Sequence, residues 1–203
     1  MRDLLRLVTL MAVTGLALPV AAQETAPAQT DETPAAEAPA TPAQQATPEA
    51  QPPQPYVKET FQDWRLVCVA LAENRESCTM QQLMRDAEGN PVSQVSLAPL
   101  PPAAAPRAAA VEIATPLETL LSEDLLIRVD TSEAKRYRFS YCTPQACVAR
   151  FALTEAEVGA YKSGGKATVT IVPLLAPDQT ASVTMSLAGF TAAYEAVTKI
   201  LAQ

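Results

Sequence analysis

Apolar and polar side chains alternate with a period of two over much of the chain beyond residue 56. The run Arg136–Tyr141 puts three aromatic residues on one face, and the runs Ala181–Leu187 and Lys166–Val172 alternate almost without a break. This alternation is typical of half-buried strands in antiparallel sheets. By the same reasoning, further strands are predicted at Trp64–Ala70, Ser77–Leu83, Val92–Leu97, Ala109–Ile113, Leu125–Asp130 and Cys147–Leu153.

Turn sequences separate the predicted strands, at Glu88–Pro91, Ser163–Gly165 and Pro177–Asp178. Short strands at this spacing are typical of sandwiches and barrels. We therefore predict a mainly β fold class, an antiparallel β-sandwich or barrel-like domain over residues 56–203, which is long enough to enclose one core.

Two short helices interrupt the strands. Thr154 is followed three residues later by Glu157, which is the pattern of a capping box, and this helix is predicted to run to about Lys162. A second helix is predicted after Gly189, because apolar residues recur at helical spacing as far as Leu201. Its narrow apolar stripe fits docking on the domain's own sheet, and the alternative is a partner-binding face.

Residues 1–22 have the organisation of a secretory signal peptide. Arg2 and Arg6 form a charged start, the run Leu7–Leu18 is apolar, and Val20–Ala22 supplies small residues before a predicted cleavage site. The apolar run is shorter than the ~20 residues that a membrane span needs, so cleavage before Gln23 is favoured over an uncleaved anchor. We expect a periplasmic protein, secreted or outer-surface associated as alternatives, with no transmembrane segment after cleavage.

Residues 23–55 are rich in alanine, proline, threonine and glutamine, and contain no aromatic residue, lysine or arginine. Such a segment buries too little apolar surface to offset its chain entropy, so it is predicted to be a disordered linker. Its prolines favour an extended coil. It is either a spacer that holds the domain away from a surface or a tolerated solubilising tail.

Charge and composition exclude several classes of protein. The chain has no histidine, so it contains no Ser-His-Asp triad, no Cys-His pair and no histidine-ligated metal site. Its formal net charge of −7 argues against a nucleic-acid binder, which needs a cationic face. Five acids lie in the predicted linker, and residues 56–203 retain a charge of only −3.

The four cysteines are expected to form two disulfides, because an exported chain matures in an oxidising compartment. Of the three possible connectivities, spacing favours Cys68 with Cys78 and Cys142 with Cys147, each across neighbouring strands. Zinc is disfavoured because the C-x2-C knuckle is missing. A redox pair is disfavoured because neither pair is a C-x-x-C at a helix start. No metal or cofactor is therefore expected.

The stretch Ala98–Ala110 is a second segment rich in alanine and proline, and it lies between two predicted strands. Its prolines cannot donate hydrogen bonds to a sheet, so a surface loop is predicted. An inserted connection is favoured over a recognition loop.

No catalytic constellation is visible in the sequence. Carboxylates such as Asp63, Glu112 and Asp130 form no pair at a spacing that general acid–base catalysis requires. One basic cluster is a candidate contact surface for anionic glycans or lipid headgroups. The alternative is that its side chains are simply solvated. This possible contact surface consists of Lys135, Arg136 and Arg138.

Several segments, taken in order, resemble the invasion-associated locus B family of exported Gram-negative proteins. The chain has DWRLVC at Asp63–Cys68, CTMQQ at Cys78–Gln82, CTPQACVA at Cys142–Ala149 and LAGFTAA at Leu187–Ala193. The segments TPLETLL at 115–121 and LIRVD at 126–130 are similar to the middle of the family pattern. Glu118 and Ala146 each stand where glycine is usual, both in turns.

The resemblance implies a β-rich periplasmic or surface-associated protein, linked in pathogenic members to invasion of host cells. It supplies no catalytic residues. We therefore expect a non-enzymatic envelope protein that acts by binding an envelope or host protein or a glycan. The alternative is a periplasmic enzyme, either a carboxylate-based hydrolase or a thiol–disulfide exchange protein.

Overall fold

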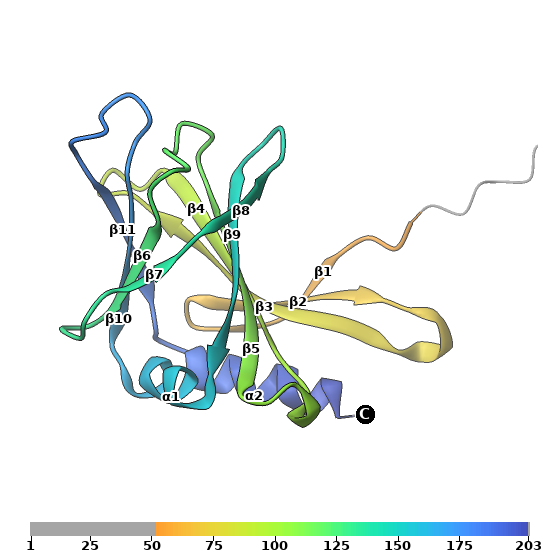
Figure 1. The fold of residues 1–203 in the computed structure, drawn as a ribbon. Coiled ribbons are helices and arrows are strands. Elements are labelled where there is room, and N and C mark those ends of the chain that lie inside the picture. Colours follow the sequence, from red (N-terminus) through yellow and green to blue (C-terminus); the bar gives the residue numbers. More distant parts are fainter. Residues whose placement is uncertain (1–51, 203) are drawn as a thin grey trace, which may run out of the picture. The chain divides into compact units, whose positions relative to one another are not determined.

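Two antiparallel sheets share one hydrophobic core in the computed structural model, which describes residues 52–202 (Figure 1). The larger sheet has the strand order β1-β2-β3-β4-β5-β9-β8 and the smaller sheet has the order β11-β10-β6-β7. The strand order of each sheet has two free edges within these residues, so the domain is a two-sheet structure and not a closed barrel. The predicted antiparallel β class is confirmed.

The bounds of the elements follow the chain in order. The strands are β1 (Tyr56–Phe61), β2 (Trp64–Ala70), β3 (Glu76–Arg85), β4 (Pro91–Pro99), β5 (Arg107–Thr115), β6 (Leu125–Val129), β7 (Lys135–Tyr137), β8 (Phe139–Cys142), β9 (Cys147–Thr154), β10 (Lys166–Ile171) and β11 (Ala181–Ser186). The helices are α1 (Glu155–Ser163) and α2 (Phe190–Leu201), with 3-10 turns at Ala72–Asn74 and Pro102–Ala104.

The predicted signal peptide, residues 1–22, lies outside the described residues, as does the predicted linker 23–55 except for its last four positions. Those four, residues 52–55, are exposed and belong to no helix or strand. None of the helices described is long and apolar enough to cross a membrane.

Strand β1 was not predicted, because five of its six residues are exposed and they show no apolar alternation. It pairs with β2 at the edge of the larger sheet. Glu76 of β3 also holds it, by accepting hydrogen bonds from the hydroxyl of Tyr56 and the ammonium group of Lys58. Side-chain contacts between β1 and β3 therefore add to the backbone pairing of β1 with β2.

The prediction of one strand over Arg136–Tyr141 was wrong. The chain changes sheets at Arg138, so β7 pairs with β6 in the smaller sheet and β8 pairs with β9 in the larger one. The aromatic residues consequently diverge: Tyr137 stacks on Phe151 with ring centroids 3.7 Å apart, whereas Tyr141 is 42 % exposed. Alternation is a local property, and it continues through a change of pairing partner.

The predicted loop Ala98–Ala110 is shorter than expected. Strand β4 continues through Pro99 and β5 begins at Arg107, so the connection is residues 100–106. Ala108 and Ala109 are buried, and the hydroxyl of Tyr194 in α2 donates a hydrogen bond to the carbonyl of Ala108. Small side chains at this end of β5 let Tyr194 of α2 approach the strand backbone.

Both helices follow their predicted ends closely. In α1 the Thr154 hydroxyl accepts from the backbone N–H of Glu157, and the Glu157 carboxylate accepts from the backbone N–H of Thr154, which completes the capping box. The apolar stripe of α2 is buried and the helix packs on β1, β2, β3 and β4, which confirms docking on the domain's own sheet (Figure 1). Gly189 precedes α2 with φ +85°, and a Cβ there would overlap the carbonyl oxygen of Phe61.

A buried glutamine side chain links the two sheets. Gln82 of β3 is 5 % exposed, and its carboxamide accepts from the backbone N–H of Ser186 (2.7 Å) and donates to the carbonyl of Ser186 (2.9 Å). These two hydrogen bonds to Ser186 replace the ones that a neighbouring strand would make at the end of β11. Sequence reasoning did not use this residue, although its register with Cys78, Met80 and Met84 places it on the buried face of β3.

Replacing Gln82 by leucine is expected to lower the free energy of unfolding by about 2 kcal/mol, because the N–H of Ser186 loses its acceptor in a partly buried position. Urea denaturation followed by circular dichroism measures the loss. The matched control is Gln94→Leu at an exposed position of β4, where the change is expected to stay within about 0.5 kcal/mol. Equal effects of the two substitutions would contradict the role of the Gln82 carboxamide.

Candidate binding surfaces

The structure contains two disulfides, and their connectivity is the one that the cysteine spacing favoured. Cys68 of β2 and Cys78 of β3 lie directly opposite each other with their Cα atoms 4.1 Å apart, and both are buried. Cys142 of β8 and Cys147 of β9 are likewise opposite, with their Cα atoms 4.0 Å apart. No cysteine is free, and all four lie in described residues.

Within residues 52–202, one group of potential metal ligands is brought together, namely Cys68, Glu76 and Cys78. The two sulfur atoms are bonded to each other, so neither is available as a thiolate ligand. The Glu76 carboxylate already accepts hydrogen bonds from Tyr56 and Lys58. This cluster is therefore part of the sheet's internal bonding and does not form a metal site.

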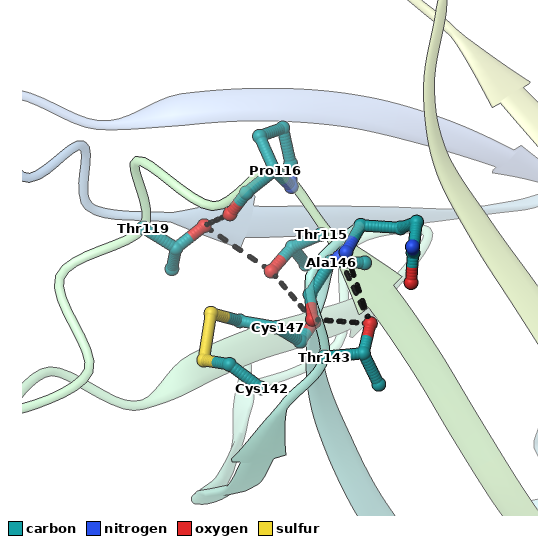
Figure 2. The surroundings of a disulfide bond; sticks show 8 residues. Thr115, Pro116, Thr119, Cys142, Thr143, Ala146 and Cys147 are labelled. Atoms are coloured by element: carbon teal, nitrogen blue, oxygen red, sulfur yellow. Dashed lines mark hydrogen bonds between the residues drawn. A yellow bond between two sulfur atoms is a disulfide. The ribbon is translucent and has the colours of Figure 1, made fainter. Parts of the chain in front are cut away.

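The second disulfide closes a hairpin whose turn is organised by threonine hydroxyls (Figure 2). The Thr143 hydroxyl accepts from the backbone N–H groups of Gln145 and Ala146, each at 3.2 Å. The buried Thr115 hydroxyl donates to the carbonyl of Cys147 (3.1 Å), and the Thr119 hydroxyl lies 3.1 Å from that of Thr115 (Figure 2). These contacts tie the loop after β5 to the disulfide hairpin.

That loop, residues 116–124, is joined in turn to the loop between β10 and β11. The N–H of Leu120 donates to the carbonyl of Val172 (2.8 Å), and the N–H of Leu174 donates to the carbonyl of Glu118 (2.6 Å). Both loops lie at the end of the domain away from α2 (Figure 1). Together they carry four exposed apolar side chains, called the leucine patch here: Leu117 (47 % exposed), Leu121 (49 %), Leu174 (50 %) and Leu175 (85 %).

The leucine patch was not identified from the sequence. Its residues lie in two loops separated by about fifty positions, and only the hydrogen bonds between those loops bring them together. Four of the nine exposed large apolar side chains of the described residues thus lie on two hydrogen-bonded loops, and this concentration favours an interaction surface. The same two loops carry four acidic residues, namely Glu118, Glu123, Asp124 and Asp178.

The predicted basic cluster is divided between different environments. The Lys135 ammonium donates to the Glu157 carboxylate at 2.6 Å, so its charge is offset. Arg136 is exposed on the opposite face of β7, because successive side chains of a strand alternate. Arg138 is exposed at the change of sheets, beside Asp124 in a surface depression. The three residues do not form one cationic surface.

The three acids considered for hydrolysis have separate surroundings. Asp63 is exposed in the turn between β1 and β2. Glu112 of β5 forms an ion pair with Arg150 of β9 on the larger sheet. Asp130 follows β6 in the smaller sheet and accepts from the backbone N–H groups of Gly165 and Lys166. Each carboxylate has its own neighbours, and no two of them converge on one site.

A pocket of about 310 Å³ lies between the smaller sheet and α1. Ile127 and Val129 of β6, Tyr137 of β7 and the α1 residues Ala160 and Tyr161 form its walls. Ser132, Glu133, Lys135, Thr154, Ala156 and Glu157 complete the lining. Sequence reasoning had used Thr154 and Glu157 only as a helix cap and had not identified either tyrosine as a site residue.

Glu157 is the most fully bonded polar group of this pocket. One carboxylate oxygen accepts from Lys135 and lies 3.4 Å from the Tyr137 hydroxyl, and the other accepts from the N–H and the hydroxyl of Thr154. Burial alone would raise the pKa of the Glu157 carboxyl, but the hydrogen bonds from Lys135 and Thr154 outweigh it and lower that pKa. Glu157 is therefore ionised at neutral pH.

Comparison with known proteins places these features in a family. The sequence model described as "Invasion associated locus B (IalB) protein" matches residues 64–198. The chain belongs to the invasion associated locus B family. The matched region begins at the first residue of β2 and ends within α2, so it spans both sheets and both disulfides.

Curated relatives and a solved structure agree with this assignment. Two proteins called Invasion protein B homolog, from Brucella abortus strain 2308 and from biovar 1 strain 9-941, are each 29 % identical over 141 residues. The alignment covers 70 % of this chain and 79 % of each relative. The crystal structure of invasion associated protein B from Bartonella henselae has the same fold, with a TM-score of 0.60 at 18 % identity, covering 71 % of this chain and 98 % of that one.

Proposed function

We propose that this invasion associated locus B family protein is exported and acts without catalysis, by binding a protein partner through the leucine patch. The observation that carries the proposal is the patch itself, four exposed leucines on two loops that are bonded to each other and to the Cys142–Cys147 hairpin. A surface held in one conformation loses little entropy on binding, which favours recognition.

Export is supported by the predicted signal peptide and by the two disulfides, since such bonds persist in oxidising compartments. The periplasm is the proposed location, with secretion or attachment to the outer surface as the alternatives. The names of the relatives, Invasion protein B homologs, agree with a role at the bacterial envelope or host interface.

The acidic residues of the two loops indicate what kind of partner the patch fits. Glu118, Glu123 and Asp178 would repel anionic lipid headgroups and acidic glycans, and Asp124 offsets the positive charge of Arg138, which lies beside it and Leu121. These acids complement a protein whose apolar contact surface is surrounded by lysine or arginine. The proposed partner is therefore an envelope or host protein with such a surface.

An enzymatic role has less support from the site geometry. The acids Asp63, Glu112 and Asp130 have separate structural contacts, and a hydrolase needs two carboxylates that converge on one substrate. Thiol–disulfide exchange favours a thiolate with a lowered pKa at a helix N-terminus, whereas both disulfides here join strands.

Site-specific photo-crosslinking in the producing bacterium tests the proposal. A photoreactive residue at Leu175 of the full chain is expected to form a discrete protein adduct in the periplasmic or surface fraction. The same residue at Glu195, which is exposed on α2 at the other end of the domain, is expected to form none. The Leu175 adduct should diminish at high salt, because charge complementarity is screened.

The variant Leu174→Asp/Leu175→Asp, with the photoreactive residue at Leu117, is expected to lose the adduct while retaining the wild-type circular dichroism spectrum. Equal adducts at Leu117 and Glu195, or full-length reduced protein in the cytosol, would overturn the proposal. An adduct that survives the double substitution would also contradict the role of the leucine patch.

A further inference from the structure

The Tyr161 side chain is a buried phenol without a hydrogen-bond partner in the described part of the chain. The residue is 6 % exposed, and its ring packs against Phe190 with centroids 5.5 Å apart. The described residues hold no fully enclosed polar side-chain atom that lacks a partner. The Tyr161 hydroxyl therefore reaches open space, and the open space that Tyr161 lines is the pocket between α1 and the smaller sheet.

The two other tyrosines of this region, buried Tyr194 and half-buried Tyr137, contrast with Tyr161. The hydroxyl of Tyr194 donates to the carbonyl of Ala108 at 3.1 Å, and that of Tyr137 lies within reach of Glu157. Buried phenols usually have such partners. Burial raises the pKa of Tyr161, so its hydroxyl stays protonated and is available both as a donor and as an acceptor.

The polar side chains nearest to Tyr137 in the pocket, those of Lys135, Glu157 and Thr154, are already bonded to one another. Glu157 is held by Lys135 and Thr154, so it has little capacity left for a ligand. Glu133 adds a negative charge to the lining, which leaves one acid in excess over the Lys135–Glu157 pair. A pocket with this balance disfavours anions, and its walls of Ile127, Val129 and the two tyrosines suit an apolar ring.

We infer that this pocket binds an uncharged aromatic or similarly compact amphiphile whose one polar group hydrogen-bonds to the Tyr161 hydroxyl. The volume of about 310 Å³ is at the small end of ligand sites and accommodates a single substituted ring. The site is separate from the leucine patch, because its lining comes from β6, β7 and α1. The inference does not depend on the proposed function.

Nuclear magnetic resonance titration of the purified full chain with p-cresol, toluene and 4-methylbenzoate tests this site. We expect p-cresol to cause saturable amide shifts on α1 and β7 with a Kd of about 1 mM. Toluene should bind about fivefold more weakly, because it leaves the Tyr161 hydroxyl without a ligand partner. The benzoate should cause no saturable shift, because the lining already has an excess of negative charge.

Two substitutions distinguish the pocket from non-specific contact. Tyr161→Phe removes only a hydroxyl that has no protein partner, so the fold should persist. In this variant the Kd of toluene should become about equal to the Kd of p-cresol. Ala160→Leu places a larger side chain in the lining and should abolish the shifts. The matched control, Tyr194→Phe, loses a hydroxyl outside the pocket and should leave the p-cresol Kd unchanged.

Several outcomes would overturn the inference. These are the absence of saturable shifts for p-cresol, equal affinity of p-cresol and toluene for the wild type, or shifts that persist unchanged in Ala160→Leu. The first of these would mean that the pocket holds only water.

Discussion

Replacement of Trp64 by alanine is expected to lower the free energy of unfolding by about 4 kcal/mol. The single tryptophan of the chain is fully buried at the start of β2, where three parts of the fold meet. Its indole N–H donates to the carbonyl of Ser186 in β11 (2.9 Å), and its ring meets Phe190 of α2 edge-on with centroids 5.3 Å apart. Alanine would leave a cavity between the two sheets and α2.

Urea denaturation followed by circular dichroism measures this loss, since the substitution also removes the tryptophan fluorescence. Trp64→Phe should lose less than half as much, because it keeps most of the ring and gives up the hydrogen bond to Ser186. Tyr141→Ala, at a 42 % exposed aromatic on the edge strand β8, is the control and should lose much less than Trp64→Ala. Similar losses for Trp64→Ala and Tyr141→Ala would show that Trp64 does not join the three elements.

Removal of the Cys68–Cys78 bond, as Cys68→Ala/Cys78→Ala, is expected to cost about 3 kcal/mol. The bond closes a loop of 10 residues between two strands in the interior of the larger sheet. The chain-entropy estimate for such a loop is about 2.7 kcal/mol, and the buried side chains that are truncated add a packing loss. Cys142→Ala/Cys147→Ala should cost only about 2 kcal/mol, because that loop spans 5 residues at the sheet edge.

Both double variants and the wild type are compared by urea denaturation with and without a reducing agent. With both bonds reduced, the stability of the wild type should fall to or below that of either variant. A larger cost for the Cys142–Cys147 pair than for the Cys68–Cys78 pair would contradict the loop-length argument. That outcome would indicate instead that the second disulfide stabilises the folded loops next to the leucine patch.

Much of the fold was predictable because its signals are local. The capping box of Thr154 and Glu157, the apolar stripe of α2 and the alternation of most strands are each contained within a dozen residues. The favoured cysteine pairing also followed from short separations, since residues close in sequence on adjacent strands tend to face each other.

The exceptions arose where a local pattern has two possible tertiary outcomes. Alternation around Arg138 did not reveal that β7 and β8 belong to different sheets. The exposed strand β1 has no apolar pattern to detect, and the alanines at the start of β5 resemble loop residues in sequence, whereas the structure buries them and bonds Ala108 to Tyr194 of α2.

The sequence by itself determined the β class, the two helices, the favoured cysteine pairing and the resemblance to the invasion-associated family. The tertiary structure alone decided how the candidate surfaces are composed. The leucine patch joins loops about fifty positions apart, and the pocket at Tyr161 joins β6 and β7 to a helix that follows two further strands. The physical reason is that periodicity records which face of an element avoids water, whereas a binding surface depends on which elements become neighbours, and long-range packing sets that arrangement.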